Sequence, residues 1–117
     1  MAKQIIGAQG EITIIKIDTA PADFADMSAV ERNAKGWIIS HSESGNHHLL
    51  TGGDVRERVR DMPQGLKVLY AILENPGQLI QDATVPHGHY DLAPGFYELR
   101  IAREYDPFAE QARRVAD

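Results

Sequence analysis

Short strand-like runs separated by turn residues are the feature that most constrains the fold of this chain. In the clearest run, Tyr97, Leu99 and Ile101 alternate with charged side chains, which is the period of a half-buried strand. Glycine, proline and asparagine, which are typical of turns, separate the runs. The pattern predicts a mainly β domain, an antiparallel β-sandwich or small barrel, with strands near residues 11–17, 37–42, 47–51, 66–73 and 97–104.

Two short helices are expected beside these strands. Ser28 stands three residues before Glu31, a spacing typical of a capping box, and Gly36 would end the helix. Asp106 and Pro107 fit the cap and first turn of a second helix near the end of the chain. The remaining chain therefore has one or two helical additions to a β core.

Three segments leave alternatives open or predict a local irregularity. The alternation changes phase at Ile14 and Ile15, which indicates a bulge or burial on both faces of the strand. Val55 and Val59 suit one face of a short helix or an edge strand. Pro94 and Gly95 suit the central positions of a type II turn.

Composition indicates one globular domain over residues 1–117. Hydrophobic residues make up 43% and charged residues 25% of the 117 residues, as in ordinary folded domains. The net charge is −5 and the basic residues are scattered, so nucleic acid is not an expected partner. No apolar run approaches the roughly 20 residues that span a bilayer, and cysteine is absent, so we expect a cytoplasmic protein that is not inserted in a membrane.

Histidines form the main concentration of chemically active side chains. In the first hairpin, a two-residue turn at Gly45 pairs either His41 or Glu43 with His48, and both registers place these three side chains on one face. His47 then faces the other way, unless the loop has three residues.

A second histidine pair follows later in the chain. His87 and His89 have the i, i+2 spacing that points both imidazoles to one side of an extended segment. Imidazole and carboxylate groups bind zinc, iron, manganese or nickel. The sequence predicts a divalent-metal site with the candidate ligands His41, Glu43, His48, His87 and His89, against the alternative of loop histidines that bind nothing.

The His-X-His pair near a Pro-Gly turn, after an earlier histidine-rich hairpin, resembles the metal-binding strands of cupins. The resemblance implies a small barrel that holds a metal through histidines and a carboxylate, although Asp91 is the nearest carboxylate to the position of the usual cupin glutamate. The chain is also similar to short uncharacterised bacterial and phage proteins with a Gly-His-X-His hairpin. Their first histidine corresponds to Asn46 and their second to His48, and this similarity implies no activity.

Two functions follow from these patterns. The first is a metal-binding or small-ligand-binding module of unknown activity, in which His41, His48 and His87 are ligands and Glu43 or His89 completes the set. The second is a non-catalytic accessory or assembly protein that pairs with its own copies or with a larger partner. In the first of these, Glu43 or His89 could instead act as a base. Nucleophilic catalysis is not expected, because the serines near His41 lack a nucleophile signature.

Overall fold

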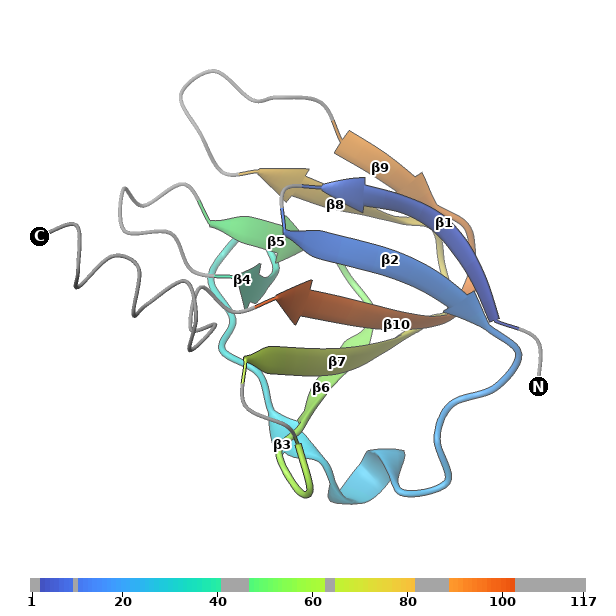
Figure 1. The fold of residues 1–117 in the computed structure, drawn as a ribbon. Helices are drawn as coiled ribbons and strands as arrows, with labels where there is room; N and C mark the ends of the chain where they lie inside the picture. The colour runs from blue at the N-terminus through green and yellow to red at the C-terminus, as the bar shows by residue number, and fades with distance from the viewer. Residues whose placement is uncertain (1–2, 10, 41–46, 63–64, 82–88, 103–117) are drawn as a thin grey trace, which may run out of the picture.

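The computed structural model describes residues 3–9, 11–40, 47–62, 65–81 and 89–102, and these residues form two antiparallel β-sheets (Figure 1). The expected mainly β fold is confirmed. The strands are β1 (Lys3–Gln9), β2 (Ile12–Ile17), β3 (Ser28–Ala29), β4 (Trp37–Ser40), β5 (His48–Leu50), β6 (Asp54–Arg58), β7 (Leu66–Leu73), β8 (Gly77–Gln81), β9 (His89–Leu92) and β10 (Gly95–Ala102), with one 3₁₀ turn, η1 (Phe24–Asp26).

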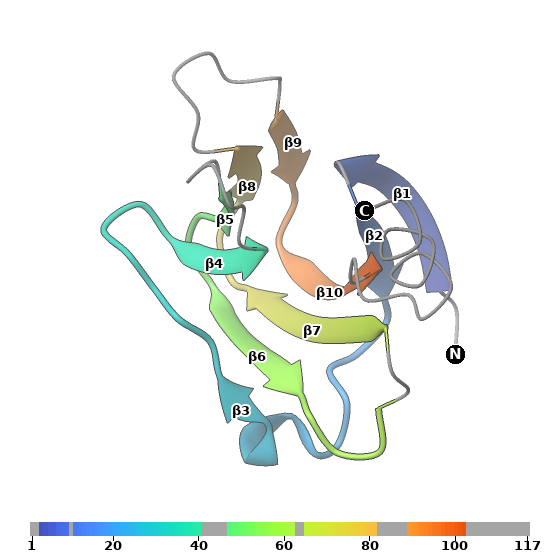
Figure 2. The same ribbon diagram turned by 60° about the vertical axis from the view of Figure 1, so that its left-hand side comes forward.

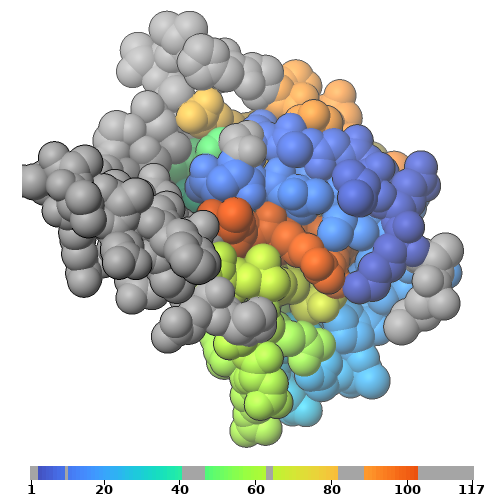
Figure 3. All heavy atoms as spheres, in the orientation of Figure 1, coloured from blue at the N-terminus to red at the C-terminus, as the bar shows by residue number. Residues whose placement is uncertain are grey.

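The two sheets differ in size and lie as separate layers. One has six strands in the order β1-β2-β10-β7-β6-β3, and the other has four in the order β4-β5-β8-β9 (Figure 2). In the space-filling view, β1, β2, β10 and β7 follow one another across the face turned to the viewer (Figure 3). No ladder joins the two sheets within the described chain, so this part forms two open sheets and not the closed barrel that was one expectation.

The core lies between the sheets and draws on the alternating strand residues of both. Leu50 and Leu79 contribute from the four-stranded sheet, and Leu69 and Leu99 from the six-stranded sheet. Tyr97 is also fully buried there, and its hydroxyl donates to the carbonyl of Ala93. Burying the ring while satisfying the hydroxyl avoids the cost of an unpaired polar group.

Strand β2 explains the phase change seen in the sequence. Ile12 and Ile14 belong to the core between the sheets, while Ile15 and Ile17 are buried on the other side of the strand. Burial on both faces is therefore confirmed. The register shift lies in the partner strand β1, just after Ile5.

The chain passes between the sheets four times at one end of the molecule, through residues 30–36, 51–53, 74–76 and 93–94; we call this the crossing end. Hydrogen bonds reinforce it: the indole N–H of Trp37 donates to the carbonyl of Gly53, and Thr51 and Gln78 exchange two bonds. The opposite end, which we call the far end, carries the start of β5 and the end of β1. Side chains bridge the sheets there.

The helix expected to begin at Ser28 is wrong. Ser28 and Ala29 form β3 and pair with β6, because tertiary contacts hold this segment against that strand. The guanidinium of Arg56 lies over the ring of Phe24 and donates to the carbonyl of Ala25. Such packing outweighs a weak local helix signal.

The other open segments are settled as follows. Residues 54–58 form a strand, and the φ of Gly95 is 154°, far from the value of about 80° that a type II turn requires. The helix expected from Asp106 lies outside the described residues. Within the described ranges, no helix has the length and apolar character needed to cross a bilayer.

Truncation of the core should destabilise the domain. We expect Leu99→Ala to lower the free energy of unfolding by about 2–5 kcal/mol, because Leu99 is fully buried between the sheets. Ile5→Ala is the matched control: Ile5 is 71% exposed, so its loss is about 1 kcal/mol or less. Urea unfolding measures both, and equal losses would contradict this position of the core.

Candidate functional site

Buried polar side chains gather at the far end. Among the described residues, four polar or charged residues are buried, and three of them, Gln9, Ser40 and His48, come together there. The core around them is apolar, and a buried polar group is costly unless it is hydrogen-bonded. The partners of these three side chains therefore define what this end can do.

Gln9 fixes the orientation and the tautomer of His48. The side-chain nitrogen of Gln9 donates to the carbonyl of Leu79 at 3.1 Å, so its amide oxygen is the atom that lies 2.8 Å from Nδ1 of His48. A carbonyl and an amide oxygen only accept hydrogen bonds. Nδ1 must therefore carry a proton, and in the neutral ring the lone pair is on Nε2.

His48 is neutral, and its second ring nitrogen has no hydrogen-bond partner among the described residues. Burial lowers the pKa of His48 below its usual value of 6.5, and the negative charge of Glu11 opposes this only in part. The residue is 8% exposed, and no group in the described chain forms a hydrogen bond with Nε2. This buried nitrogen lone pair can therefore accept a bond from a ligand or coordinate an ion.

Ser40 joins this histidine to a carboxylate. Ser40 is paired directly with His48 across β4 and β5, so the two side chains share a face of the sheet. Its hydroxyl donates to Oε1 of Glu11 at 2.6 Å. The far end therefore combines an imidazole, a hydroxyl and a carboxylate from three separate segments.

The structure separates His48 from His89. His48 is opposite Gln81, whereas His89 is opposite Ile80, and consecutive residues of β8 point to opposite faces. His89 is half-exposed, with Nε2 3.4 Å from Oδ1 of Asp91. The two histidines cannot bind one ion in this arrangement.

The two registers expected from a two-residue turn are wrong, and the observed pairing has the parity of the three-residue alternative. Ser40, and not His41 or Glu43, is opposite His48, because the pairing shifts by one residue between Ile38 and Ser40. His41, Glu43 and His87 lie outside the described residues. His47 is partly buried just before β5 and has interactions of its own. Over the described ranges, no three His, Asp or Glu side chains form a metal-binding group.

Three residues of this cluster were not predicted as site residues. Gln9 and Glu11 flank the turn between two strands, and Ser40 ends an apolar run. The sequence signal that could have found them is the position of Gln9, Ser40 and His48 next to apolar strand residues. Polar side chains buried at such positions require hydrogen-bond partners. Only the fold shows that these side chains lie together and that Gln9 and His48 are hydrogen-bonded to each other.

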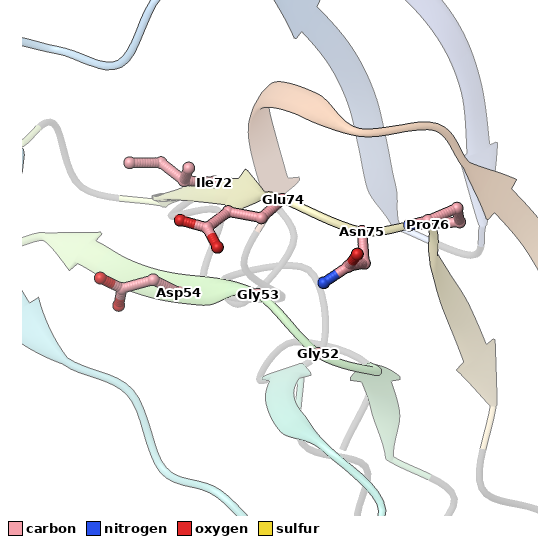
Figure 4. Close-up of a pocket in the computed structure, with 7 residues that line it drawn as sticks. All are labelled: Gly52, Gly53, Asp54, Ile72, Glu74, Asn75 and Pro76. Carbon is pink, nitrogen blue, oxygen red and sulfur yellow. The ribbon is translucent and has the colours of Figure 1, made fainter.

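A surface hollow lies at the crossing end (Figure 4). It has a volume of about 480 Å³ and is lined by Gly52, Gly53, Asp54, Ile72, Glu74, Asn75 and Pro76. Its two carboxylates are those of Asp54, at the start of β6, and of Glu74, which directly follows β7. The carboxylate of Asp54 is 3.7 Å from Nε of Arg56. These groups are at the surface, so the hollow lacks the buried, unpaired atom that distinguishes the far end.

Glu98 is the fourth buried polar residue, and its carboxylate is fully satisfied. It accepts hydrogen bonds from Arg100 at 2.6 Å, Tyr70 at 3.0 Å and Lys3 at 3.1 Å on the outer face of the six-stranded sheet. Burial alone would raise the pKa of Glu98, but these donors outweigh burial and lower it below 4.5. Glu98 is therefore the centre of a structural ion-pair cluster.

The comparisons with known proteins give a family. Residues 8–102 match the family model of a domain of unknown function, DUF8820, which covers most of the chain. No curated protein and no solved structure matches the sequence significantly.

The Glu98 cluster predicts acid sensitivity. Because the pKa of Glu98 is lowered on folding, its contribution to stability is present above pH 4.5 and is lost as the pH falls below that value through the folded-state pKa. Glu98→Gln should lower the free energy of unfolding by about 1–3 kcal/mol at pH 7 and flatten this acid dependence. Unfolding measured from pH 7 to pH 3 tests both, and an unchanged slope in the variant would contradict the assignment.

Proposed function

We propose that this chain, which belongs to the DUF8820 family of domains, binds a divalent metal ion through Nε2 of His48. The observation that carries the proposal is the buried Nε2 lone pair without a partner in the described chain. Metal-binding histidines use the neutral ring and donate their other N–H to a fixed acceptor. The oxygen of Gln9 supplies that acceptor here.

The ligand type limits the candidate ions to those that accept imidazole nitrogen. These include zinc, iron, manganese and nickel, as expected from the sequence. His41, Glu43 and His87 stay predicted as further ligands. His89 does not join the proposed site, because it is on the opposite face of the four-stranded sheet.

We also infer a sandwich-like architecture for the domain in preference to a cupin-like barrel. Two open antiparallel sheets pack over one core in the described chain, and this supports the inference. The proposed metal site therefore does not depend on the cupin resemblance.

A second candidate function is self-association through β1. Ile5 and Ile6 are 71% and 36% exposed on this edge strand of the six-stranded sheet. Further along, the backbone N–H of Ala8 is capped by the hydroxyl of Tyr90 at 3.4 Å, so the part before Gly7 is the more open edge. Exposed edges pair readily with another strand.

The occupant that we assign to this edge is a second copy of the chain. In antiparallel pairing about Ile5, the two copies of Lys3 would be about 13 Å apart, beyond the screening length of about 10 Å at 0.1 M salt. A stable interface involves roughly 20–30 residues on each side, and pairing of this short edge involves far fewer. We therefore expect the dimer to be weak.

Metal titration tests the first function. We expect His48→Ala to weaken binding of Zn²⁺ or Ni²⁺ by at least the roughly 10–100-fold of an orienting residue, because it removes a ligand. His89→Ala is the matched control and should bind as the parent does. Isothermal titration of protein prepared without chelator measures the affinities, with circular dichroism as a fold check. Equal affinities in both variants, or no binding by the parent, would disprove the proposal.

Sedimentation at rising protein concentration tests the second function. Ile5→Lys should abolish any dimer, because it places charge at the centre of the paired edge. Val59→Lys changes a residue that is 58% exposed outside β1, and it should leave association unchanged. A monomer at all concentrations, or equal effects of the two substitutions, would rule out pairing through β1.

A further inference from the structure

We infer that Glu11 is the second protein donor to the ion at His48 and that Ser40 holds Glu11 in position. This inference rests on the proposed function and adds to it an oxygen ligand and a class of ion. It assigns a binding role to two residues that sequence patterns did not mark as ligands.

The carboxylate of Glu11 is held on one side and open on the other. Ser40 donates to Oε1 at 2.6 Å, a short bond typical of a charged acceptor. Within the described chain, no hydrogen bond reaches Oε2. Glu11 is exposed, so an ion can approach its carboxylate from solvent.

Ser40 brings this carboxylate to the side of His48. Directly opposed residues of an antiparallel pair have Cβ atoms about 4.5–5.5 Å apart. Ser40 and His48 are such a pair, and the hydroxyl of Ser40 contacts Glu11 directly. The negative charge of Glu11 also acts on the imidazole, where it favours a positive charge. A metal cation would satisfy both observations at once.

Lys67, a cation at this end of the described chain, is bound to other groups. The ammonium of Lys67 donates to the carbonyl of Ile39 at 3.2 Å and lies 4.0 Å from Oε1 of Glu57. Glu11 has no ion pair with a described cation. Its charge is therefore available to a bound ion.

The donor pair selects a class of ion. One imidazole nitrogen and one carboxylate oxygen suit Zn²⁺, Mn²⁺, Fe²⁺, Co²⁺ or Ni²⁺. All-oxygen ligands would favour Ca²⁺, and sulfur ligands would favour Cu⁺. Two protein donors also leave coordination positions for water or for a small ligand.

Titration with Zn²⁺ and with Co²⁺, whose visible absorption reports its ligands, tests this inference. Glu11→Gln keeps the shape of the side chain and removes the charge, and it should lower affinity at least 10-fold and change the Co²⁺ spectrum. Ser40→Ala should lower affinity by about 10-fold, as loss of an orienting partner does, and Ser40→Thr should restore it. Glu74→Gln, at the crossing end, is the matched control and should have no effect.

The outcomes separate this inference from the proposed function. If Glu11→Gln binds like the parent while His48→Ala does not, Glu11 is not a ligand and the role of His48 stands. If the parent binds neither ion, both are wrong. If Glu11→Gln weakens binding but Ser40→Ala does not, the positioning role of Ser40 is wrong. Unfolding midpoints of all variants show that each protein is folded during the titration.

Discussion

The four crossings between the sheets at one end are the constraint on which the rest of the structure depends. They hold the sheets together covalently beside Leu50 and Leu73, and the indole of Trp37 ties the same end to Gly53. Within the described chain, hydrogen bonds between side chains and from side chains to backbone join the sheets at the far end. Gln9 reaches from the six-stranded sheet to His48 and to the carbonyl of Leu79. Burial of polar residues at the far end is therefore a consequence of the topology.

That consequence determines where chemistry can occur. A hydrogen-bonded polar cluster inside an apolar core is favourable only when every member has a partner. Gln9 is satisfied at both ends of its amide, and Ser40 donates to a carboxylate. Within the described chain, the atoms of this cluster that lack a hydrogen bond are Nε2 of His48 and Oε2 of Glu11. The hydrogen bond between Nδ1 of His48 and Gln9 fixes the position of Nε2. A binding site requires this kind of preorganisation.

The sequence predicted the strands that have strong periodicity and missed what depends on pairing. Residues 66–73 were predicted as a strand and form β7, because a β-rich run bounded by turn residues is a local signal. Strand β1 was missed, since its glycine and glutamines weaken that signal. The hairpin register was wrong because one extra residue near Ile39 shifts the pairing, and a single-residue shift changes the face of every later side chain. The sequence named His48 as a metal ligand, and that role stays a prediction.

A purely structural role would use only one of the two ring nitrogens of His48, Nδ1. The hydrogen bond to Gln9 requires one N–H donor at Nδ1, which the amide of an asparagine also supplies without a second ring nitrogen. Leu49 and Leu50, the next two residues, show that apolar side chains pack well on this strand. An imidazole adds to these alternatives a second nitrogen, and burial keeps the ring neutral so that this nitrogen can accept. Packing and hydrogen bonding within the described chain therefore leave Nε2 of His48 unexplained, and this is the atom of His48 that a ligand would contact.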